Sequence, residues 1–369
     1  MSTKPAKPTT GRKFSFRPTK DGHKEATIAV MGCTGSGKTT FVNLASKSHL
    51  RVGAGLESCT DTIQKSQPFE LDGYTVTLVD TPGFDDTNKS EVEILTMICD
   101  YLREEYAHRR CLRGVIYLHR ISDNRVGGTA LQNIRFFHRL CGDKALKNSV
   151  VITNMWNQVT SEVGTSRETE LKSKDIFFKP AIDKGAAMLR HDNTIESAHN
   201  AIRHMLHNKP MPLAIQVELV TDKKPIYETE AGQTLLGEMA TREQKHQREL
   251  EALKKELEEA KRDHDTEAMQ DIEEARLRLD AEVGQLIDER QRLLGPDAEG
   301  ARERRKLSWM RRVVLPFVHL RASVFGICCT GFVFTCLFSI YQWRSAWTHP
   351  LAIIQTGFAE GGPSLDEIP

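Results

Sequence analysis

The most constraining feature of this 369-residue chain is a glycine-rich segment at residues 32–39, Gly-Cys-Thr-Gly-Ser-Gly-Lys-Thr. It follows the apolar, partly β-branched run 26–31, which we predict to be a buried strand. It precedes residues 40–46, which contain neither Gly nor Pro and are expected to begin a helix. In such a strand–loop–helix connection the glycines let the backbone curl, so that its N–H groups and the helix N-terminus can hold a phosphate. The sequence therefore predicts binding of a nucleoside triphosphate.

Two side chains of this loop have distinct expected roles. Lys38 would place a point charge on the β- and γ-phosphates, and the Thr39 hydroxyl could ligate Mg²⁺. A glycine-rich turn that binds nothing is the alternative, but the signature positions all occur in the expected context. The residues predicted to contact the nucleotide here are Gly32, Cys33, Thr34, Gly35, Ser36, Gly37, Lys38, Thr39 and Thr40.

A second part of the predicted site is the sequence Asp80-Thr81-Pro82-Gly83, which ends the apolar run 77–79. A carboxylate at the end of a buried strand beside a phosphate loop can hold Mg²⁺ through water, which we predict for Asp80. The Gly83 N–H is then free to approach a γ-phosphate closely. The same four residues also form ordinary turns, so the prediction depends on their position after the phosphate loop.

Between these motifs lies the hydroxyl-rich segment 53–62, which contains two candidate threonines. A loop at this place could fold a threonine onto Mg²⁺ when a γ-phosphate is present and release it after hydrolysis. We favour Thr60 over Thr62 for this role. A solvated loop threonine is the alternative.

The chain around these motifs alternates strand-like and helical patterns over residues 25–209, which predicts an α/β fold. We expect a three-layer P-loop NTPase domain, in which a parallel sheet has helices on both faces. The predicted strands are 26–31, 74–79, 114–119 and 149–153, and the predicted helices lie near 90–107, 128–141 and 194–207. With 51 Lys and Arg against 50 Asp and Glu, the chain has no global nucleic-acid-binding signature. Its eight cysteines include no Cys-x-x-Cys, so neither a disulfide framework nor a zinc site is expected.

The regions flanking this domain differ sharply in composition. Residues 1–24 read as a disordered basic tail and residues 210–230 as a linker. Apolar residues at three- to four-residue spacing over 231–294 predict a coiled coil, whose register slips around 264–269. A single solvated helix held by ion pairs is the alternative. If wholly helical, this spacer would reach roughly 90–100 Å at about 1.5 Å per residue.

The C-terminal region contains 22 positions without a charge, at residues 322–343, long enough for a membrane-spanning helix. The basic segment 295–321 precedes it and the polar tail 344–369 follows. By the positive-inside rule, we predict a single-pass C-terminal anchor with the nucleotide-binding domain facing the cytosol. A core or oligomerisation helix is the alternative.

The motifs together resemble those of septin-like GTPases, above all the immunity-associated GTPase (IMAP) family and its fungal-style relatives. The resemblance covers residues 25–209 and includes the strand and polar loop 117–123. It implies binding of GTP or GDP with Mg²⁺, a metal held by Thr39, Thr60 and Asp80, and catalytic roles for Lys38, Thr60 and Gly83. It also fits a C-terminal coiled coil and membrane anchor, and a homodimer formed through the G domain or the coiled coil.

Two departures from the family pattern affect the expected chemistry. Where the family has (Asn/Thr)-Lys-x-Asp to read guanine, this chain has Asn154-Met155-Trp156-Asn157. Asn154 and Asn157 remain the predicted base contacts and Trp156 could stack on a base. Asn157 offers one acceptor oxygen where a carboxylate would take two hydrogen bonds. Such bonds contribute roughly 1.5–3 kcal/mol each, so guanine preference would fall, and xanthine would fit better.

The second departure is Phe84, at the position where Ras-like enzymes place a glutamine that orients water. Turnover should therefore be slow, unless a second subunit, the switch loop, Arg120 or Arg125 supplies the missing group. The main hypothesis is a slow, membrane-tethered GTPase that acts as a switch through dimerisation or partner binding. The alternatives are a tether with a barely hydrolysed nucleotide, or an NTPase with relaxed base preference. An ATP-dependent small-molecule kinase is disfavoured, because no substrate lid or arginine-rich clamp follows the loop.

Overall fold

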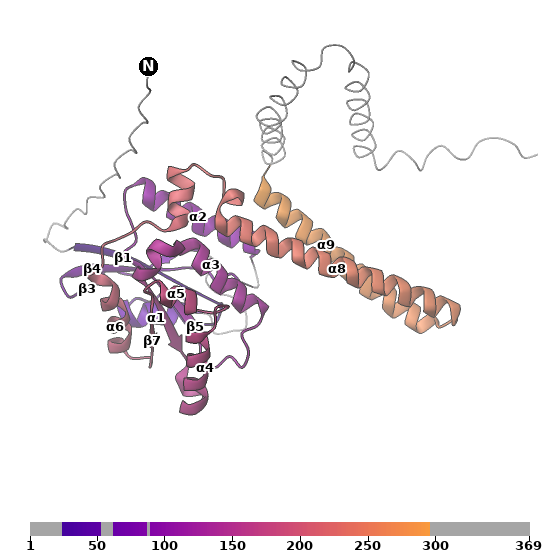
Figure 1. Ribbon diagram of the computed structural model, residues 1–369, viewed down its shortest axis with the longest axis horizontal. Helices are drawn as coiled ribbons and strands as arrows, with labels where there is room; N and C mark the ends of the chain where they lie inside the picture. Colours follow the sequence, from indigo (N-terminus) through magenta and orange to yellow (C-terminus); the bar gives the residue numbers. More distant parts are fainter. Residues whose placement is uncertain (1–23, 53–61, 87–88, 296–369) are drawn as a thin grey trace, which may run out of the picture. The chain divides into compact units, whose positions relative to one another are not determined.

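The computed structural model describes residues 24–52, 62–86 and 89–295. A seven-stranded sheet forms the centre, in the order β2-β4-β1-β5-β6-β7, with β3 also paired to β4 (Figure 1). Five strands run parallel: β1 (Lys24–Gly32), β4 (Tyr74–Asp80), β5 (Gly114–Arg120), β6 (Ser149–Asn154) and β7 (Ala187–Arg190). All four predicted strands are present among them.

The sheet is mixed, which corrects the expectation of a purely parallel one. Strands β2 (Gln64–Lys65) and β3 (Phe69–Leu71) run antiparallel to β4. The cause is the two-residue turn Asp72-Gly73, in which both residues have positive φ, 50° and 76°. Asp-Gly in this conformation closes a tight hairpin whose twist matches that of the flanking strands.

Helices cover both faces of the sheet, as predicted. Alternate residues of β1 point to opposite faces: Ile28 and Val30 pack in one core cluster, and Ala29 and Met31 in the other. Helices α1 (Lys38–Ser46) and α6 (Ile195–Leu206) cover the first face. Helices α2 (Glu91–Ala107), α3 (Gly128–Ala145), α4 (Ser161–Ser173) and α5 (Lys179–Asp183) contribute to the core of the second. Short 3₁₀ turns lie at Leu146–Asn148 and Trp156–Gln158.

The segment 210–230, predicted as a linker, packs against the domain instead. It forms α7 (Ala214–Gln216), a π-helical turn (Val217–Thr221) and a 3₁₀ turn (Ile226–Glu228). Leu213, Ile215 and Leu219 are buried in the same core cluster as α2 and α3. The fully buried Gln216 donates its Nε2 hydrogen to the Leu102 carbonyl of α2 at 3.1 Å. Burial of these apolar side chains extends the core beyond residue 209.

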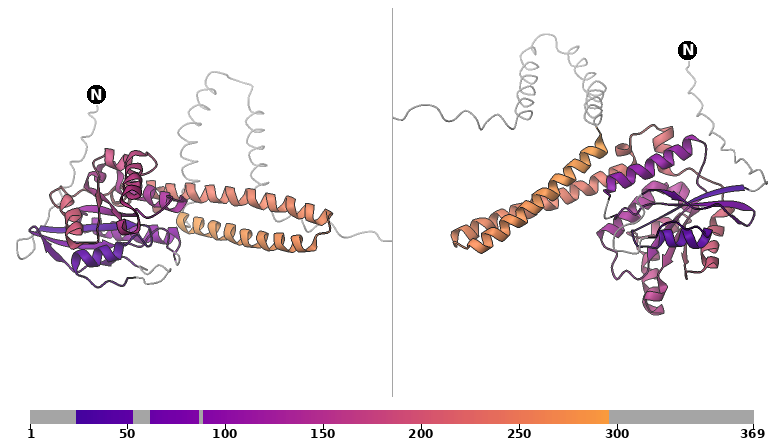
Figure 2. Two further views of the ribbon diagram at one scale, coloured as in Figure 1. Left: turned by 90° about the horizontal axis from the view of Figure 1, so that it is seen from below. Right: turned by 180° about the vertical axis from the view of Figure 1, so that it is seen from behind.

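The helical region that follows is a hairpin, which corrects the expected 90–100 Å reach of a single extended spacer. Helices α8 (Glu230–Arg262) and α9 (Thr266–Leu294) lie side by side and run in opposite directions (Figure 2, left). Arg290 Nη1 accordingly lies 3.3 Å from Glu243 Oε2. The chain reverses where the register slip was predicted: His264 has φ 56°, and Asp265 Oδ1 accepts the Ala268 N–H at 3.0 Å to cap α9.

No helix within the described ranges is long and apolar enough to cross a bilayer. The predicted span 322–343 lies outside the described residues. So do the N-terminal tail up to residue 23, residues 296–321 of the basic segment, and the polar tail 344–369.

Candidate nucleotide-binding site

The phosphate loop connects β1 to α1 and keeps Lys38 inside it. Gly37, with φ 92°, precedes the first residue of α1. The Lys38 ammonium is buried and donates to the carbonyls of Gly32 at 2.9 Å and Cys33 at 2.8 Å. Burial lowers the pKa of Lys38, while the nearby carboxylates of Asp80 and Asp85 oppose that shift. The ammonium is therefore held in place, where an anion entering the loop would meet it.

Thr39 and Asp80, two of the residues predicted to hold a metal ion, are in direct contact. Thr39 Oγ1 donates to Asp80 Oδ2 at 2.6 Å across the gap between α1 and the end of β4. Asp80 is fully buried, and burial raises its pKa against the opposing effects of Thr39 and Lys38. The other oxygen, Asp80 Oδ1, is buried without a hydrogen-bond partner within the described structure. An orphaned carboxylate oxygen beside a hydroxyl fits a hard cation such as Mg²⁺, whose ligands are oxygens.

Two more loop oxygens, Thr34 Oγ1 and Ser36 Oγ, are buried without partners among the residues described. Buried polar atoms are nearly always hydrogen-bonded, so clustered exceptions in one loop indicate a polar ligand. Both lie in the stretch that the sequence assigns to phosphate binding. The donor set therefore fits a phosphate with its metal ion.

The Asp80–Gly83 turn packs directly onto the phosphate loop. Thr81 Oγ1 donates to the Val30 carbonyl of β1 at 2.9 Å, which anchors the turn. A Cβ on Gly83 would lie 2.5 Å from Thr34 N, so only glycine allows this approach. The structure therefore brings the two sequence motifs together, with Gly83 packed against Thr34 of the phosphate loop.

The next residues of this turn point in different directions. The Phe84 ring is buried and stacks on Phe136 of α3, with ring centroids 4.5 Å apart. It faces the core, and its apolar ring has no group that could orient water. Asp85 turns the other way, and its Oδ1 accepts the Thr34 N–H at 2.6 Å. Asp85 could not be identified from the sequence, because nothing local to it indicates a partner 51 residues away.

On the side predicted to hold the base, Asn154 connects β6 to the phosphate loop. Its Nδ2 donates to the Ser36 carbonyl at 3.1 Å, and its Oδ1 accepts the Met155 N–H at 2.7 Å. Asn154 therefore positions the loop through its amide. Asn157 is exposed on the 3₁₀ turn that follows, open to a ligand.

Trp156 is packed by protein on one face, which restricts its predicted stacking on a base. The Arg190 guanidinium lies 4.0 Å from the centroid of its ring, and Trp156 Nε1 donates to the Thr153 carbonyl at 3.0 Å. Glu168 holds Arg190 in turn, at 2.8 Å. This end of β7 could not be predicted from the sequence, because a four-residue strand gives little periodicity.

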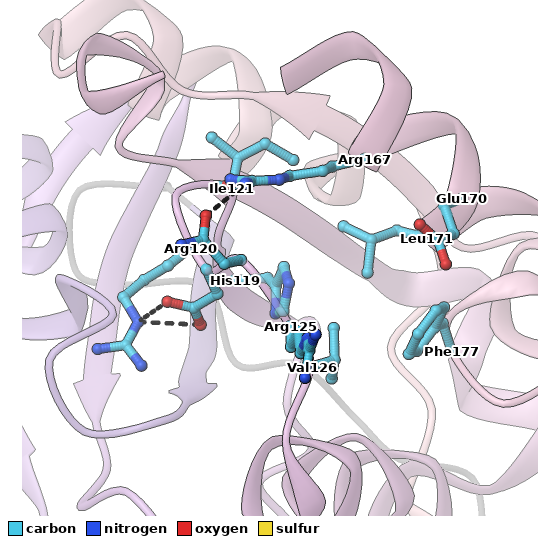
Figure 3. A pocket seen from close by; sticks show the side chains of 11 residues that line it. His119, Arg120, Ile121, Arg125, Val126, Arg167, Glu170, Leu171 and Phe177 are labelled. Carbon is cyan, nitrogen blue, oxygen red and sulfur yellow. Dashed lines mark hydrogen bonds and ion pairs between the residues drawn. The ribbon is translucent and has the colours of Figure 1, made fainter. Parts of the chain in front are cut away.

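Of the two candidate arginines, Arg120 lies against the phosphate loop. A Cβ on Gly35 would be 3.2 Å from Arg120 Nη1, and Arg120 is paired with Asp123 at 3.0 Å. Arg125 is exposed and, with Arg120, lines a cavity of about 210 Å³ beside this pair (Figure 3). Burial lowers the pKa of His119, another lining residue, to about 4. The segment with Thr60 lies outside the described residues.

Comparison with known proteins defines the class of this site. Residues 27–155 match the family model described as 50S ribosome-binding GTPase. This part of the chain is a P-loop GTPase G domain. No curated protein sequence matches the chain significantly. The finer resemblance to septin-like and immunity-associated GTPases stays a prediction.

Several solved structures align with part of the chain at low similarity. Toc33 from Arabidopsis thaliana, in complex with Mg²⁺ and GMPPNP, is 18% identical over 46% of this chain and 71% of its own, with a TM-score of 0.36. The G domain of the FeoB iron transporter from T. maritima is 16% identical over 49% of this chain and 98% of its own, with a TM-score of 0.32. These values assign the chain to neither protein.

Proposed function

We propose that the chain is a Mg²⁺-dependent GTP-binding protein that hydrolyses GTP slowly and acts as a nucleotide-controlled switch. The observation that carries the proposal is the meeting of Lys38, the Thr39–Asp80 pair and Gly83 at one phosphate loop. Lys38 would neutralise the β- and γ-phosphates, while Thr39 and Asp80 would hold the metal ion directly and through water. The metal supplies charge neutralisation on the phosphates when it is bound. Thr60, from the segment between the motifs, would complete its shell.

Slow hydrolysis follows from the placement of Phe84. Its ring stacks on Phe136 and faces the core, so the side chain at position 84 is not placed to orient the attacking water. A second copy of the chain or a partner would have to complete the site. The exposed Arg125 and the loop-facing Arg120 are the side chains that such a contact would engage.

The contacts of α2 offer a route from the nucleotide to the helical hairpin. Glu91 begins α2, eight residues after Gly83. Its carboxylate is paired with Arg242 of α8 and accepts a hydrogen bond from Gln132 Nε2 at 2.8 Å. Glu93 of the same helix turn lies 4.0 Å from Arg292 of α9. A movement of the turn on GTP binding would therefore act on both helices of the hairpin.

Replacement of Lys38 tests the nucleotide site. We expect Lys38→Ala in the full-length protein to lower GTP and GDP affinity by at least tenfold, because charge-assisted contacts to phosphate contribute roughly 1.5–3 kcal/mol each. Lys254→Ala, an exposed lysine on α8, is the matched control and should bind normally. Isothermal titration in Mg²⁺ measures both. Unchanged GTP binding by Lys38→Ala would refute the proposal.

The main alternative is a tether in which bound nucleotide is structural and barely hydrolysed. The buried Phe84 and the exposed Asn157 support it, since neither supplies the usual catalytic or guanine-reading group. Single-turnover assays at increasing protein concentration distinguish the two. Hydrolysis that accelerates with concentration supports a switch completed by a second copy.

Titration of GTP, ATP and XTP measures base preference, and tighter ATP binding would end the GTPase interpretation.

We also propose that residues 322–343 anchor the protein in a membrane, with the G domain on the cytosolic side. The support is the length of the uncharged segment and the basic residues that precede it. Flotation of the full chain with vesicles, compared with a chain ending at residue 295, tests the anchor. Equal recovery of both chains in the soluble fraction would refute it.

A further inference from the structure

The carboxylate of Asp85 lies on the phosphate loop itself. Its Oδ1 accepts the Thr34 N–H at 2.6 Å, and a Cβ placed on the neighbouring Gly83 would lie 2.9 Å from the same oxygen. The charge of Asp85 acts on both Lys38 and the Cys33 thiol. The carboxylate of Asp85 therefore takes up the Thr34 N–H, one of the backbone donors with which a phosphate loop holds an anion.

A triphosphate and Asp85 would need the same place. The proposed function sets the terminal phosphoryl group between Lys38 and the Gly83 N–H, and Gly83 packs directly against Thr34. The Asp85–Thr34 hydrogen bond is at that contact. A diphosphate ends one phosphoryl group earlier and can leave this hydrogen bond intact, whereas a triphosphate must displace the carboxylate or bind beside it at the cost of charge repulsion.

We propose that Asp85 is an internal anion that makes this site favour a nucleoside diphosphate over the triphosphate. This inference rests on the proposed function and deepens it, because it assigns the discrimination between the two ligands to one side chain. Displacement of Asp85 would also move the chain that leads into α2. The N-cap residue of this helix, Ser90, lies four residues after Asp86, the residue that follows Asp85. Release of Asp85 from Thr34 would thus be the first step of the switch.

The variant Asp85→Asn isolates the charge. An asparagine oxygen can still accept the Thr34 N–H, so the local shape is kept while the negative charge is removed. In the full-length protein with Mg²⁺, we expect the affinity for a non-hydrolysable GTP analogue to rise on the order of tenfold. GDP affinity should stay within about twofold, because the diphosphate does not reach the carboxylate. Asp85→Ala, a second neutral variant that removes the charge together with the Thr34 hydrogen bond, should also favour the GTP analogue over GDP if Asp85→Asn fails to fold.

Asp86→Asn is the matched control, since it removes the same charge one residue along the chain and leaves the Thr34 contact in place. It should change the ratio of GTP-analogue to GDP affinity much less than Asp85→Asn does. A ratio unchanged in Asp85→Asn, or changed equally by Asp86→Asn, would overturn the role of Asp85. Failure of the unaltered protein to bind either nucleotide would instead refute the proposed function.

Discussion

Leu235 allows a test of whether the base of the helical hairpin belongs to the G-domain core. It lies on α8, outside the sequence-predicted domain 25–209, and its side chain is fully buried in the core cluster that contains α2 and α3. Leu→Ala at a fully buried site costs about 2–5 kcal/mol, from lost transfer free energy and the cavity left behind. For a domain of this size, a loss of about 3 kcal/mol would lower the melting temperature by roughly 6–12 °C.

The measurement can use one intrinsic reporter. A fragment of residues 24–295 contains a single tryptophan, Trp156, which lies beside the nucleotide site, far along the chain from Leu235. Its fluorescence during thermal or urea unfolding reports on the G domain alone. Leu277→Ala on α9, where the side chain is 59% exposed, is the matched control and should shift the transition by less than about 0.5 kcal/mol.

If Leu235→Ala left the Trp156 transition unchanged, the hairpin would unfold independently of the G domain. The reasoning from core burial would then be refuted. If both leucine variants shifted the transition equally, the effect would come from helix stability in general. In that case too, packing at the base of α8 would not be its cause.

Two further predictions concern the core near the site. Phe84→Gln should not speed hydrolysis, because the side chain at this position faces the core, and faster single-turnover hydrolysis would contradict this. The same substitution should lower the free energy of unfolding by about 3 kcal/mol, because it removes the ring stacked on Phe136 and buries an amide. Burial lowers the pKa of His119 in the native state to about 4, whereas an unfolded histidine has a pKa of about 6.5. Between these two pH values the unfolded chain binds a proton at His119 and the native state does not, so the native state loses stability as the pH falls. The contribution is at most about 1.4 kcal/mol per pH unit, and His119→Phe should flatten the dependence of urea unfolding on pH over this window.

The sequence was most informative where local chemistry determines local structure. The phosphate loop and the Asp80–Gly83 turn could be placed at strand ends because short apolar runs precede them, and parallel strand ends meet at one edge. The antiparallel β3 was missed although Asp72-Gly73 is a hairpin signal. Its strand is three residues long and gives no visible period.

Contacts between distant segments were beyond the sequence analysis. Asp85 reaches Thr34 across 51 residues, and Arg190 covers Trp156 from a separate strand. The sequence also left open whether residues 231–294 continue as one helix or fold back on themselves, because an apolar stripe on a helix indicates only that some other segment covers it. Asp265 gave the available signal, since an N-cap residue after a break in the register begins a new helix.

The return of α9 determines where a force on the C-terminal part of the chain would be felt. At about 1.5 Å per residue, α8 extends about 50 Å outward and α9 brings the chain about 44 Å back. Near its end, Leu293 is buried in the core and Arg292 lies 4.0 Å from Glu93 of α2. Tension applied beyond Gly295 would therefore act at the base of the hairpin, where α9 contacts α2, and not at its far tip.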